Sequence, residues 1–529
     1  MTQDWRALGL RPAEGGAPIP GGPRDVCDAL LRVTAATPDA LALISRHARF
    51  TFAQLRAHVE ALAFELWRRG VRPGDRVAAC AGNHAEIAVA FFAAQRISAV
   101  WVGVNRNLAP PEKRFILNDS GARLLFADTD VLDALGEDVG GVSDCIDMAP
   151  ASEAFWRLCT PRGEATALPA VDPHAPAAIA YTSGTTGFPK GVVHSQHNMV
   201  LVGAVARAQG RAGPGLRQGV ALPLTILNLV ILGPLQSMIG GGVCILMDRL
   251  DTLGLADWIA REQVHTFAAT PAMIHDLITR PDIPPHALEC LKEPRAGGAA
   301  LPESFRQLYR DRFGVDLQFS YGLTEAPTVV CLTDYASHPA EGASGVALPH
   351  LELGILAADA TLLGPGESGE ICLRASPGGA WAEVYTPMLG YWRRPDATEA
   401  ALAGGWLHTG DIGKLDEFGN LFVEGRANDV IVRGGANIYP AEIERVLHMD
   451  DQVAGCAVIG AADARLGEVV VAFVQSGADT VALEARLREL CDANLARYKH
   501  PSRWIFVDDL PRNTMNKVIK AELRARLSL

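Results

Sequence analysis

The stretch AAIAYTSGTTGFPKGVVHS, residues 177–195, decides the fold that we predict for this chain. An apolar strand runs into a turn of glycine, threonine and serine, and a second strand follows directly. Glycine lets the backbone approach an anion closely, and successive backbone N–H groups form an anion-binding nest. We therefore predict a strand, a phosphate-binding turn and a strand, with a tight surface turn as the alternative interpretation.

The side chains of this turn suit a polyphosphate. Its hydroxyl donors, its glycines and its positive charge come from Thr182, Ser183, Gly184, Thr185, Thr186, Gly187 and Lys190. The turn differs from the P-loop of kinases and ATPases, because no serine or threonine follows the lysine. Hydroxyl contacts adapt easily, so the turn suits a phosphate group that moves or leaves.

The composition narrows the class of protein. With 529 residues the chain is too long for one hydrophobic core, so two or more domains are expected. A net charge of -12 argues against a nucleic-acid partner. The ten cysteines form no CxxC pair and the N-terminus has no apolar run of a signal peptide, which together favour a cytoplasmic protein.

Helices and strands alternate along the first part of the chain. From Thr51 a helical apolar pattern leads into the short strand RVAAC, and this rhythm predicts parallel sheets sandwiched by helices. Residues 218–247 carry no charged side chain and are numerous enough to span a bilayer. Pro223, Asn228 and Pro234 interrupt them, so we predict a buried strand, helix and strand and no membrane span.

The pattern changes towards the C-terminus, and the change predicts the domain organisation. Short strands replace the α/β rhythm after about residue 350, and a separate α+β pattern begins near residue 430. We predict an α/β protein whose large N-terminal domain, with several subdomains, covers residues 1–424. Residues 425–429 would form a hinge, and residues 430–529 a small mobile α+β domain.

Seven further stretches follow the turn in order, and with it they resemble the motifs of one superfamily. They are GGAALP (297–302), YGLTEA (321–326), GYWRRPDAT (390–398), GWLHTGD (405–411), GRAND (425–429), GGANIYPAEIE (434–444) and PRNTMNK (511–517). From about residue 30 onwards the chain resembles the adenylate-forming, AMP-dependent synthetases and ligases, in their acyl-CoA and aryl-CoA synthetase branch.

The resemblance implies an adenylating reaction with ATP, Mg²⁺ and coenzyme A. A carboxylate would attack the α-phosphorus of ATP, and the turn would hold the β- and γ-phosphates that leave as pyrophosphate. Glu325 and Thr182 would be metal ligands, and the Thr324 hydroxyl would contact the carboxylate or the α-phosphate. Lys517 would be the catalytic lysine that bridges these two groups as charge develops.

The resemblance also implies where the rest of the nucleotide, the acid and CoA bind. Tyr321 would lie flat against adenine, Asp411 would accept both ribose hydroxyls, and Arg426 would contact ribose or phosphate. The remaining positions are Gly298, Ala299 and Gly322 for the adenine and acyl pockets, Gly434 and Gly435 for the pantetheine tunnel, Tyr498 for the CoA nucleotide and Asn428 for the hinge pivot.

Three positions depart from the pattern of the family. Asn428 stands where the pivot is usually lysine or aspartate, and Asn516 stands where glycine usually precedes the lysine. Some aryl-CoA ligases share the second departure. Thr225 and Ile226 replace an aromatic residue and a histidine near the acyl carboxylate, which predicts an apolar and wider acyl pocket.

These features predict an acid–CoA ligase for an apolar acid that is aryl, alicyclic or of medium chain length. The alternative is an adenylating enzyme that loads the acyl group onto a separate carrier protein. A luciferase-like oxygenase and a non-catalytic nucleotide-binding regulator are less favoured, the latter because Lys517, Glu325 and the threonines of the turn are all present. The expected partners are a small carboxylic acid and CoA. For the oligomeric state, a homodimer is the alternative to a monomer.

Overall fold

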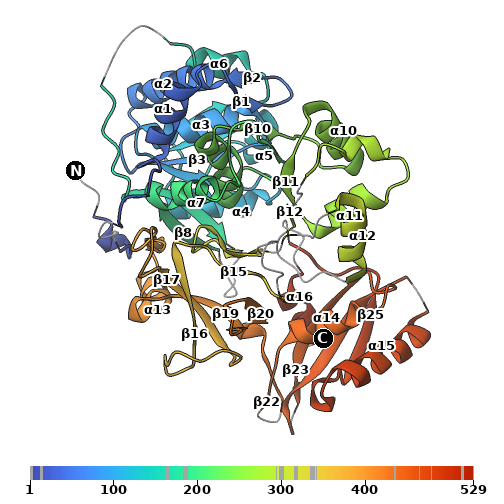
Figure 1. The fold of residues 1–529 in the computed structure, drawn as a ribbon. Helices are drawn as coiled ribbons and strands as arrows, with labels where there is room; N and C mark the ends of the chain where they lie inside the picture. Colours follow the sequence, from blue (N-terminus) through green and yellow to red (C-terminus); the bar gives the residue numbers. More distant parts are fainter. Residues whose placement is uncertain are drawn as a thin grey trace.

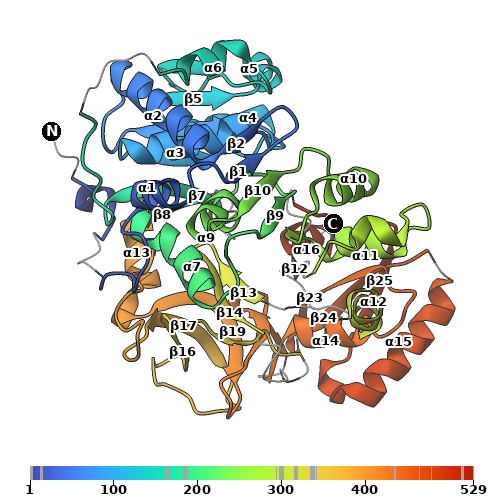
Figure 2. The same cartoon turned by 45° about the horizontal axis from the view of Figure 1, so that its top comes forward.

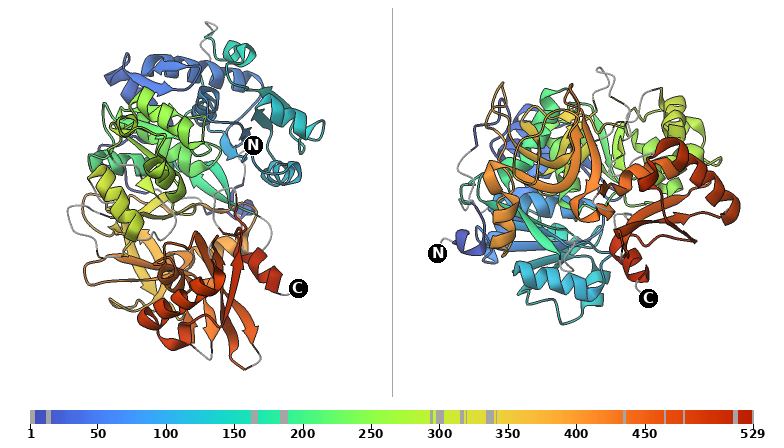
Figure 3. Two further views of the ribbon diagram at one scale, coloured as in Figure 1. Left: turned by 90° about the vertical axis from the view of Figure 1, so that its right-hand side faces the viewer. Right: turned by 90° about the horizontal axis from the view of Figure 1, so that it is seen from below.

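The computed structural model describes residues 4–11, 16–161, 167–182, 189–292, 295–296, 303–314, 318, 320–333, 340, 342–433, 436–463, 465–477, 479–513 and 518–527. They form two neighbouring sheets covered by helices, two antiparallel sheets below them, and a final α+β unit (Figure 1). Figures 2 and 3 show from further sides how this final unit, in red, lies beside the four-stranded antiparallel sheet in orange.

The first sheet has seven strands, and it contains the two strands of the predicted turn. Its order is β18 (Gly390–Tyr391), β8 (Lys190–Ser195), β7 (Pro176–Thr182), β4 (Val100–Gly103), β3 (Arg76–Cys80), β5 (Leu124–Ala127) and β6 (Asp144–Asp147). The strands from β7 to β6 are parallel, whereas β8 pairs antiparallel with β7 and β18. The helices of this part are α2 (Phe52–Arg68), α3 (Ala85–Arg96), α4 (Pro110–Ser120), α5 (Thr129–Leu135), α6 (Glu153–Leu158) and α7 (Gln196–Ala208).

The second sheet has six strands and lies beside the first. Its order is β12 (Arg295–Ala296), β11 (Thr266–Ala269), β9 (Arg217–Val220), β10 (Val243–Leu246), β1 (Leu41–Ile44) and β2 (Arg49–Thr51), and only β1 and β2 pair antiparallel. Its helices are α1 (Val26–Ala36), α8 (Leu227–Val230), α9 (Gln236–Gly240), α10 (Thr252–Glu262), α11 (Pro271–Thr279) and α12 (Glu303–Phe313).

The uncharged stretch over residues 218–247 lies in the core of this second sheet. It forms β9, α8, a wide π-type turn (Ile231–Leu235), α9 and β10, so the predicted buried strand, helix and strand is confirmed. Pro234 lies within the wide turn, where its missing N–H costs the helix little. Among the described ranges, no helix combines the length and the hydropathy needed to cross a bilayer.

Two antiparallel sheets carry the segment between the parallel sheets and the final unit. The three-stranded sheet consists of β13 (Ser320–Leu323), β14 (Thr328–Leu332) and β15 (Val346–Ala347). The four-stranded sheet consists of β16 (Leu351–Leu356), β17 (Gly369–Ala375), β19 (Leu407–Leu415) and β20 (Leu421–Arg426), with α13 (Pro395–Ala401) between β18 and β19 in the chain. The short turn between β13 and β14 carries Thr324 and Glu325 towards the first sheet.

The final unit has an interior of its own. Its strands are β21 (Ile431–Arg433), β22 (Ala436–Ile438), β23 (Gly455–Asp463), β24 (Gly467–Gln475) and β25 (Arg503–Val507), and its helices are α14 (Pro440–Leu447), α15 (Thr480–Asn494) and α16 (Lys520–Leu527). Alternate side chains of β24 enter two separate apolar clusters, one on each face of the sheet, and both clusters draw only on residues 431–527. The predicted fold class is confirmed, with helices covering parallel sheets and a separate α+β unit at the end.

Candidate active site

Tyr391 on β18 brings a predicted phosphate ligand and a predicted metal ligand together. Its hydroxyl donates to Oε1 of Glu325 at 2.9 Å, and Lys190 Nζ lies 5.2 Å from the centre of its ring. Burial, and then the charge of Glu325, raise the pKa of the Tyr391 hydroxyl, which therefore remains a proton donor. The strand β18 is only two residues long, and it reaches this place because Tyr391 pairs with Val192 of β8.

The two predicted metal ligands, Glu325 and Thr182, carry oxygen atoms of a kind that suits a hard cation such as Mg²⁺. Glu325 is half-buried and, beyond the oxygen that accepts from Tyr391, has a second carboxylate oxygen to offer. Thr182, the other predicted ligand, is the last residue of β7, and its hydroxyl donates to the Lys190 carbonyl oxygen at 3.5 Å. Carboxylate and hydroxyl oxygens are ligands that Mg²⁺ accepts.

Thr182 and Lys190 also mark the two ends of the predicted phosphate-binding turn. They are opposite one another in the ladder between β7 and β8, so the predicted flanking strands are confirmed. Arg512 and Val518, on either side of the Lys517 segment, pair in an isolated antiparallel bridge. The predicted site residues outside the described ranges are Ser183, Gly184, Thr185, Thr186, Gly187, Gly298, Ala299, Gly434, Gly435 and Lys517.

A buried histidine supports the backbone beside Glu325. His194 on β8 donates its Nε2–H to the carbonyl oxygen of Thr324 at 2.6 Å, because a carbonyl can only accept. Burial lowers the pKa of His194 to about 4, so the ring is neutral at pH 7. This role was not predictable from the sequence, since a single histidine in an apolar strand is typical of a core position.

The neutral state of His194 makes stability depend on pH. Its pKa is about 4 in the folded chain against the ordinary 6.5, so between these values the unfolded chain binds more protons. The stabilising contribution is present above pH 6.5 and declines as the pH falls towards 4, by roughly 3 kcal/mol in the free energy of unfolding. We expect urea unfolding from about pH 7.5 to about pH 4.5 to show this slope. A His194→Gln variant should show a shallower slope, and an unchanged slope would contradict the assignment.

Asp411 on β19 joins two other predicted site residues. The Tyr321 hydroxyl donates to its Oδ2 at 2.6 Å, and Arg426 Nε lies 2.7 Å from its Oδ1. Asp411 itself is buried, and burial followed by the Asp411 charge raises the pKa of the Tyr321 hydroxyl. The residues predicted to meet adenine, ribose and phosphate therefore converge from β13, β19 and β20. The hydrogen bond from the Tyr321 hydroxyl to Asp411 was not predicted, because a role was predicted only for the face of the tyrosine ring.

The two residues that depart from the family pattern in the expected acyl pocket lie near the carboxyl end of β4. A Cβ atom added to Gly103 would lie 1.8 Å from the carbonyl oxygen of Thr225, so only glycine permits this approach. Asn83 fixes the segment before it, because its Oδ1 accepts from the Leu224 N–H at 3.0 Å. Thr225 is buried and Ile226 half-buried, and the Thr225 hydroxyl meets no hydrogen-bond partner within the described part of the chain.

The remaining predicted positions lie apart from these two clusters. Gly322 is an exposed residue of β13, and Tyr498 is exposed on the final unit, where its carbonyl oxygen accepts from Arg433 at 2.6 Å. The backbone of Asn428 forms part of a single 3₁₀ turn (Ala427–Asp429) between β20 and β21. At the end of that turn Asp429 pairs with Arg524 of α16 at 2.7 Å.

Two stretches that cover most of the chain match known protein families. Residues 30–392 match the AMP-binding enzyme family, and residues 442–517 match the C-terminal domain of AMP-binding enzymes. The first stretch contains the strands of the turn, Glu325 and Tyr391, and the second contains most of the final unit.

Individual proteins resemble the chain over nearly its whole length. The long-chain-fatty-acid–CoA ligase FadD13 of Mycobacterium tuberculosis is 32% identical over 492 residues, which are 92% of this chain and 94% of that protein. The fatty acid–[acyl-carrier-protein] ligase ScoC of Streptomyces coeruleorubidus is 32% identical over 502 residues, with coverages of 92% and 94%. The solved structure of o-succinylbenzoate CoA synthetase from Bacillus subtilis, in complex with its acyl-adenylate intermediate, matches with a TM-score of 0.79 and 30% identity, covering 95% of this chain and 98% of that one.

Proposed function

Because the chain belongs to the family of AMP-binding enzymes, we propose that it is an AMP-forming acid–CoA ligase. It would activate a carboxylic acid with ATP and then transfer the acyl group to CoA. The observation that supports this most strongly is the arrangement around Tyr391, where Lys190 and Glu325 meet. The Asp411 cluster adjoins it through the segment that carries both Tyr321 and Glu325.

In the first half-reaction a carboxylate oxygen of the acid attacks the α-phosphorus, and the bond from this phosphorus to the oxygen of the leaving pyrophosphate breaks. Lys190 would neutralise the leaving phosphates, and Mg²⁺ held by Glu325 and Thr182 would spread their charge. Thr324 would place its hydroxyl on the reacting groups. Lys517 would stabilise the charge that develops between carboxylate and phosphate.

In the second half-reaction the CoA sulfur attacks the carbonyl carbon of the acyl-adenylate. The bond from that carbon to the phosphate oxygen breaks, AMP leaves, and the thiol proton passes to solvent. Gly434 and Gly435 would border the pantetheine arm, because a side chain at either position would narrow the passage. Tyr498, exposed on the final unit, would lie against the CoA nucleotide.

A change of orientation would separate the two half-reactions. We place the hinge at residues 425–429, with Asn428 as the pivot, between an N-terminal domain of residues 1–424 and a mobile domain of residues 430–529. The 3₁₀ turn between β20 and β21 supports this assignment, because a single short turn joins the last strand of one sheet to the first strand of another.

The proposed substrate is an apolar acid that is aryl, alicyclic or of medium chain length. The proposed location of the enzyme is the cytoplasm. Ile226 supports the apolar substrate, since it supplies an apolar side chain to the expected acyl pocket. The B. subtilis relative acts on o-succinylbenzoate, an aryl acid, whereas FadD13 acts on long-chain fatty acids. The second candidate function is transfer to a carrier protein, which the equal similarity to ScoC favours.

One assay tests the proposal. The protein is incubated with Mg²⁺, ATP and a panel of aryl, alicyclic and fatty acids, with and without CoA, and pyrophosphate, AMP and ADP are measured. Many turnovers of pyrophosphate and AMP only with CoA present would support the CoA ligase and identify its acid class. About one turnover of pyrophosphate, unchanged by CoA, would favour a carrier-protein acceptor. ADP in place of AMP would contradict the proposed reaction.

A further inference from the structure

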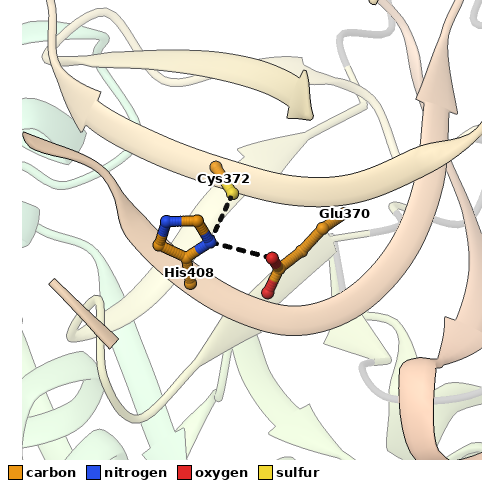
Figure 4. Close-up of side chains that lie close together, drawn as sticks. All are labelled: Glu370, Cys372 and His408. Carbon is orange, nitrogen blue, oxygen red and sulfur yellow. Dashed lines mark hydrogen bonds and ion pairs between the residues drawn. The ribbon is translucent and has the colours of Figure 1, made fainter. Parts of the chain in front are cut away.

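Three side chains of the four-stranded sheet meet on one of its faces (Figure 4). Glu370 and Cys372 are two residues apart on β17 and therefore face the same way, and His408 of β19 lies directly opposite Cys372. His408 Nδ1 lies 2.8 Å from Glu370 Oε2 and 3.4 Å from Cys372 Sγ. On β19, His408 precedes Asp411, the residue predicted to bind ribose, by only two intervening residues.

The pairing of β17 with β19 is irregular at this point. Glu370 lies opposite Ile412 and Cys372 lies opposite His408, so one residue of β17 faces three residues of β19. Residues 409–411, two more than a regular ladder would hold here, bulge away from β17 and end at Asp411. Gly410 in the middle has a φ of +70°, which glycine adopts without strain.

Glu370 holds this bulge from both sides. Its Oε2 accepts from His408 Nδ1 before the bulge, and its Oε1 accepts from the Gly410 N–H within it at 3.0 Å. Thr409 completes the support, because its hydroxyl donates to the Ile371 carbonyl oxygen at 2.7 Å and accepts from the Asp411 N–H at 3.0 Å. Hydrogen bonds to an ionised carboxylate are among the strong ones, so Glu370 contributes more to this geometry than a neutral acceptor would.

We infer that Glu370 is a positioning residue that sets the orientation of Asp411 and thereby the selectivity of the site for the ribose of the nucleotide. The inference rests on the proposed function in one respect, the contact between Asp411 and the ribose hydroxyls. The hydrogen bonds of Glu370 run to His408 and Gly410, and neither of these is a predicted nucleotide or acid contact. Glu370 acts through the backbone of the bulge, which determines where the Asp411 carboxylate meets Tyr321 and Arg426.

The state of the thiol agrees with a hydrogen-bonded role for the trio. Burial, and then the charge of Glu370, raise the pKa of Cys372 to about 12, so the thiol stays protonated at neutral pH. The His408 Nδ1–H is donated to Glu370, and the Cys372 sulfur makes a longer contact with the same nitrogen. The carboxylate is therefore the member of the trio that links both strands.

The test compares Glu370→Ala and Glu370→Gln with wild type in acid-dependent pyrophosphate formation, using ATP, 2′-deoxyATP and 3′-deoxyATP. Loss of charged hydrogen bonds should raise the KM for ATP about tenfold in the alanine variant, with the KM for acid and CoA unchanged. The preference for ATP over the two deoxynucleotides should fall by a similar factor. Glutamine keeps one acceptor but turns an N–H₂ group towards the other donor, so its effect should be intermediate.

Glu352→Ala is the matched control. Glu352 lies on β16 of the same sheet and pairs at the surface with Arg374 at 2.9 Å, so its loss should leave ribose selectivity as in wild type. A change of selectivity in the control as large as that in Glu370→Ala would overturn the inference, because general damage to the sheet would then account for both.

A double-mutant cycle with Asp411→Ala separates the inference from the proposed function. If Glu370 acts through Asp411, the Glu370→Gln change should have almost no effect on nucleotide selectivity once Asp411 is removed. Selectivity lost in Asp411→Ala but retained in both Glu370 variants would overturn the inference alone. Selectivity retained in Asp411→Ala would overturn the ribose assignment as well. Stoichiometric zinc in the purified protein that a Cys372→Ala variant lacks would assign the trio to metal binding and also overturn the inference.

Discussion

Replacing Lys517 with alanine should reduce acyl-adenylate formation by about 10²- to 10³-fold, the size expected when a group that stabilises developing charge is removed. Transfer to CoA from a supplied acyl-adenylate should remain near the wild-type rate, because the bond between the carboxylate and the α-phosphorus is already formed in the supplied adenylate. Pyrophosphate exchange measures the first half-reaction, and thioester formation from synthetic adenylate measures the second. This difference between half-reactions is the expected signature of the lysine.

Lys520→Ala is the control for this experiment. Lys520 lies three residues further along and pairs with Glu444 at 2.8 Å within the final unit. Removing that lysine also removes one positive charge, but both half-reactions should stay within about twofold of wild type. Equal loss of both half-reactions in Lys517→Ala would contradict the assigned role and indicate damage to the C-terminal domain instead.

Replacing Glu325 with glutamine should have the second largest effect. The change keeps an oxygen that can accept from the Tyr391 hydroxyl but removes the negative charge that would hold Mg²⁺. We expect pyrophosphate exchange to fall by about 10²-fold and to recover partly at high Mg²⁺ concentration, since weaker binding can be offset by mass action. A Mg²⁺ titration of the exchange rate measures both effects.

Tyr391→Phe separates the charge of Glu325 from its hydrogen bond. Phenylalanine keeps a ring face for Lys190 and removes only the hydroxyl that donates to Glu325. Its exchange rate should fall only a few-fold and its Mg²⁺ dependence should stay close to that of wild type. If Glu325→Gln showed wild-type Mg²⁺ dependence, the metal assignment would be wrong.

Local patterns were sufficient to predict the strands and helices that frame the site. The strand before the phosphate-binding turn ends at Thr182, and the strand after it begins at Lys190. Both were predictable because an apolar run and a glycine-rich turn are patterns of residues that are adjacent in the sequence. The helix predicted from Thr51 onwards is equally local, since the Thr51 side chain caps its first turn by accepting from the Gln54 N–H.

Contacts between distant segments were not predictable in the same way. Tyr391 lies 66 residues from Glu325, and a strand of two residues leaves no periodic pattern that would place it beside β8. His194 was missed for the same reason, since its partner is the backbone of Thr324, 130 residues away. The bulge at Asp411 contacts Glu370 of a different strand. Glu370 accepts a hydrogen bond from the Gly410 N–H, which lies 40 residues away in the sequence.

The two apolar clusters of the final unit have a mechanical consequence. Because residues 431–527 supply the interior on both faces of its sheet, this body keeps its contacts whatever its angle to the rest of the chain. A rotation at the proposed hinge would therefore exchange one outer surface for another, and the buried apolar side chains would stay out of water. The free energy that such a rotation must overcome would then come from contacts at the outer surface of the unit, such as that of Arg524 with Asp429 of the proposed hinge.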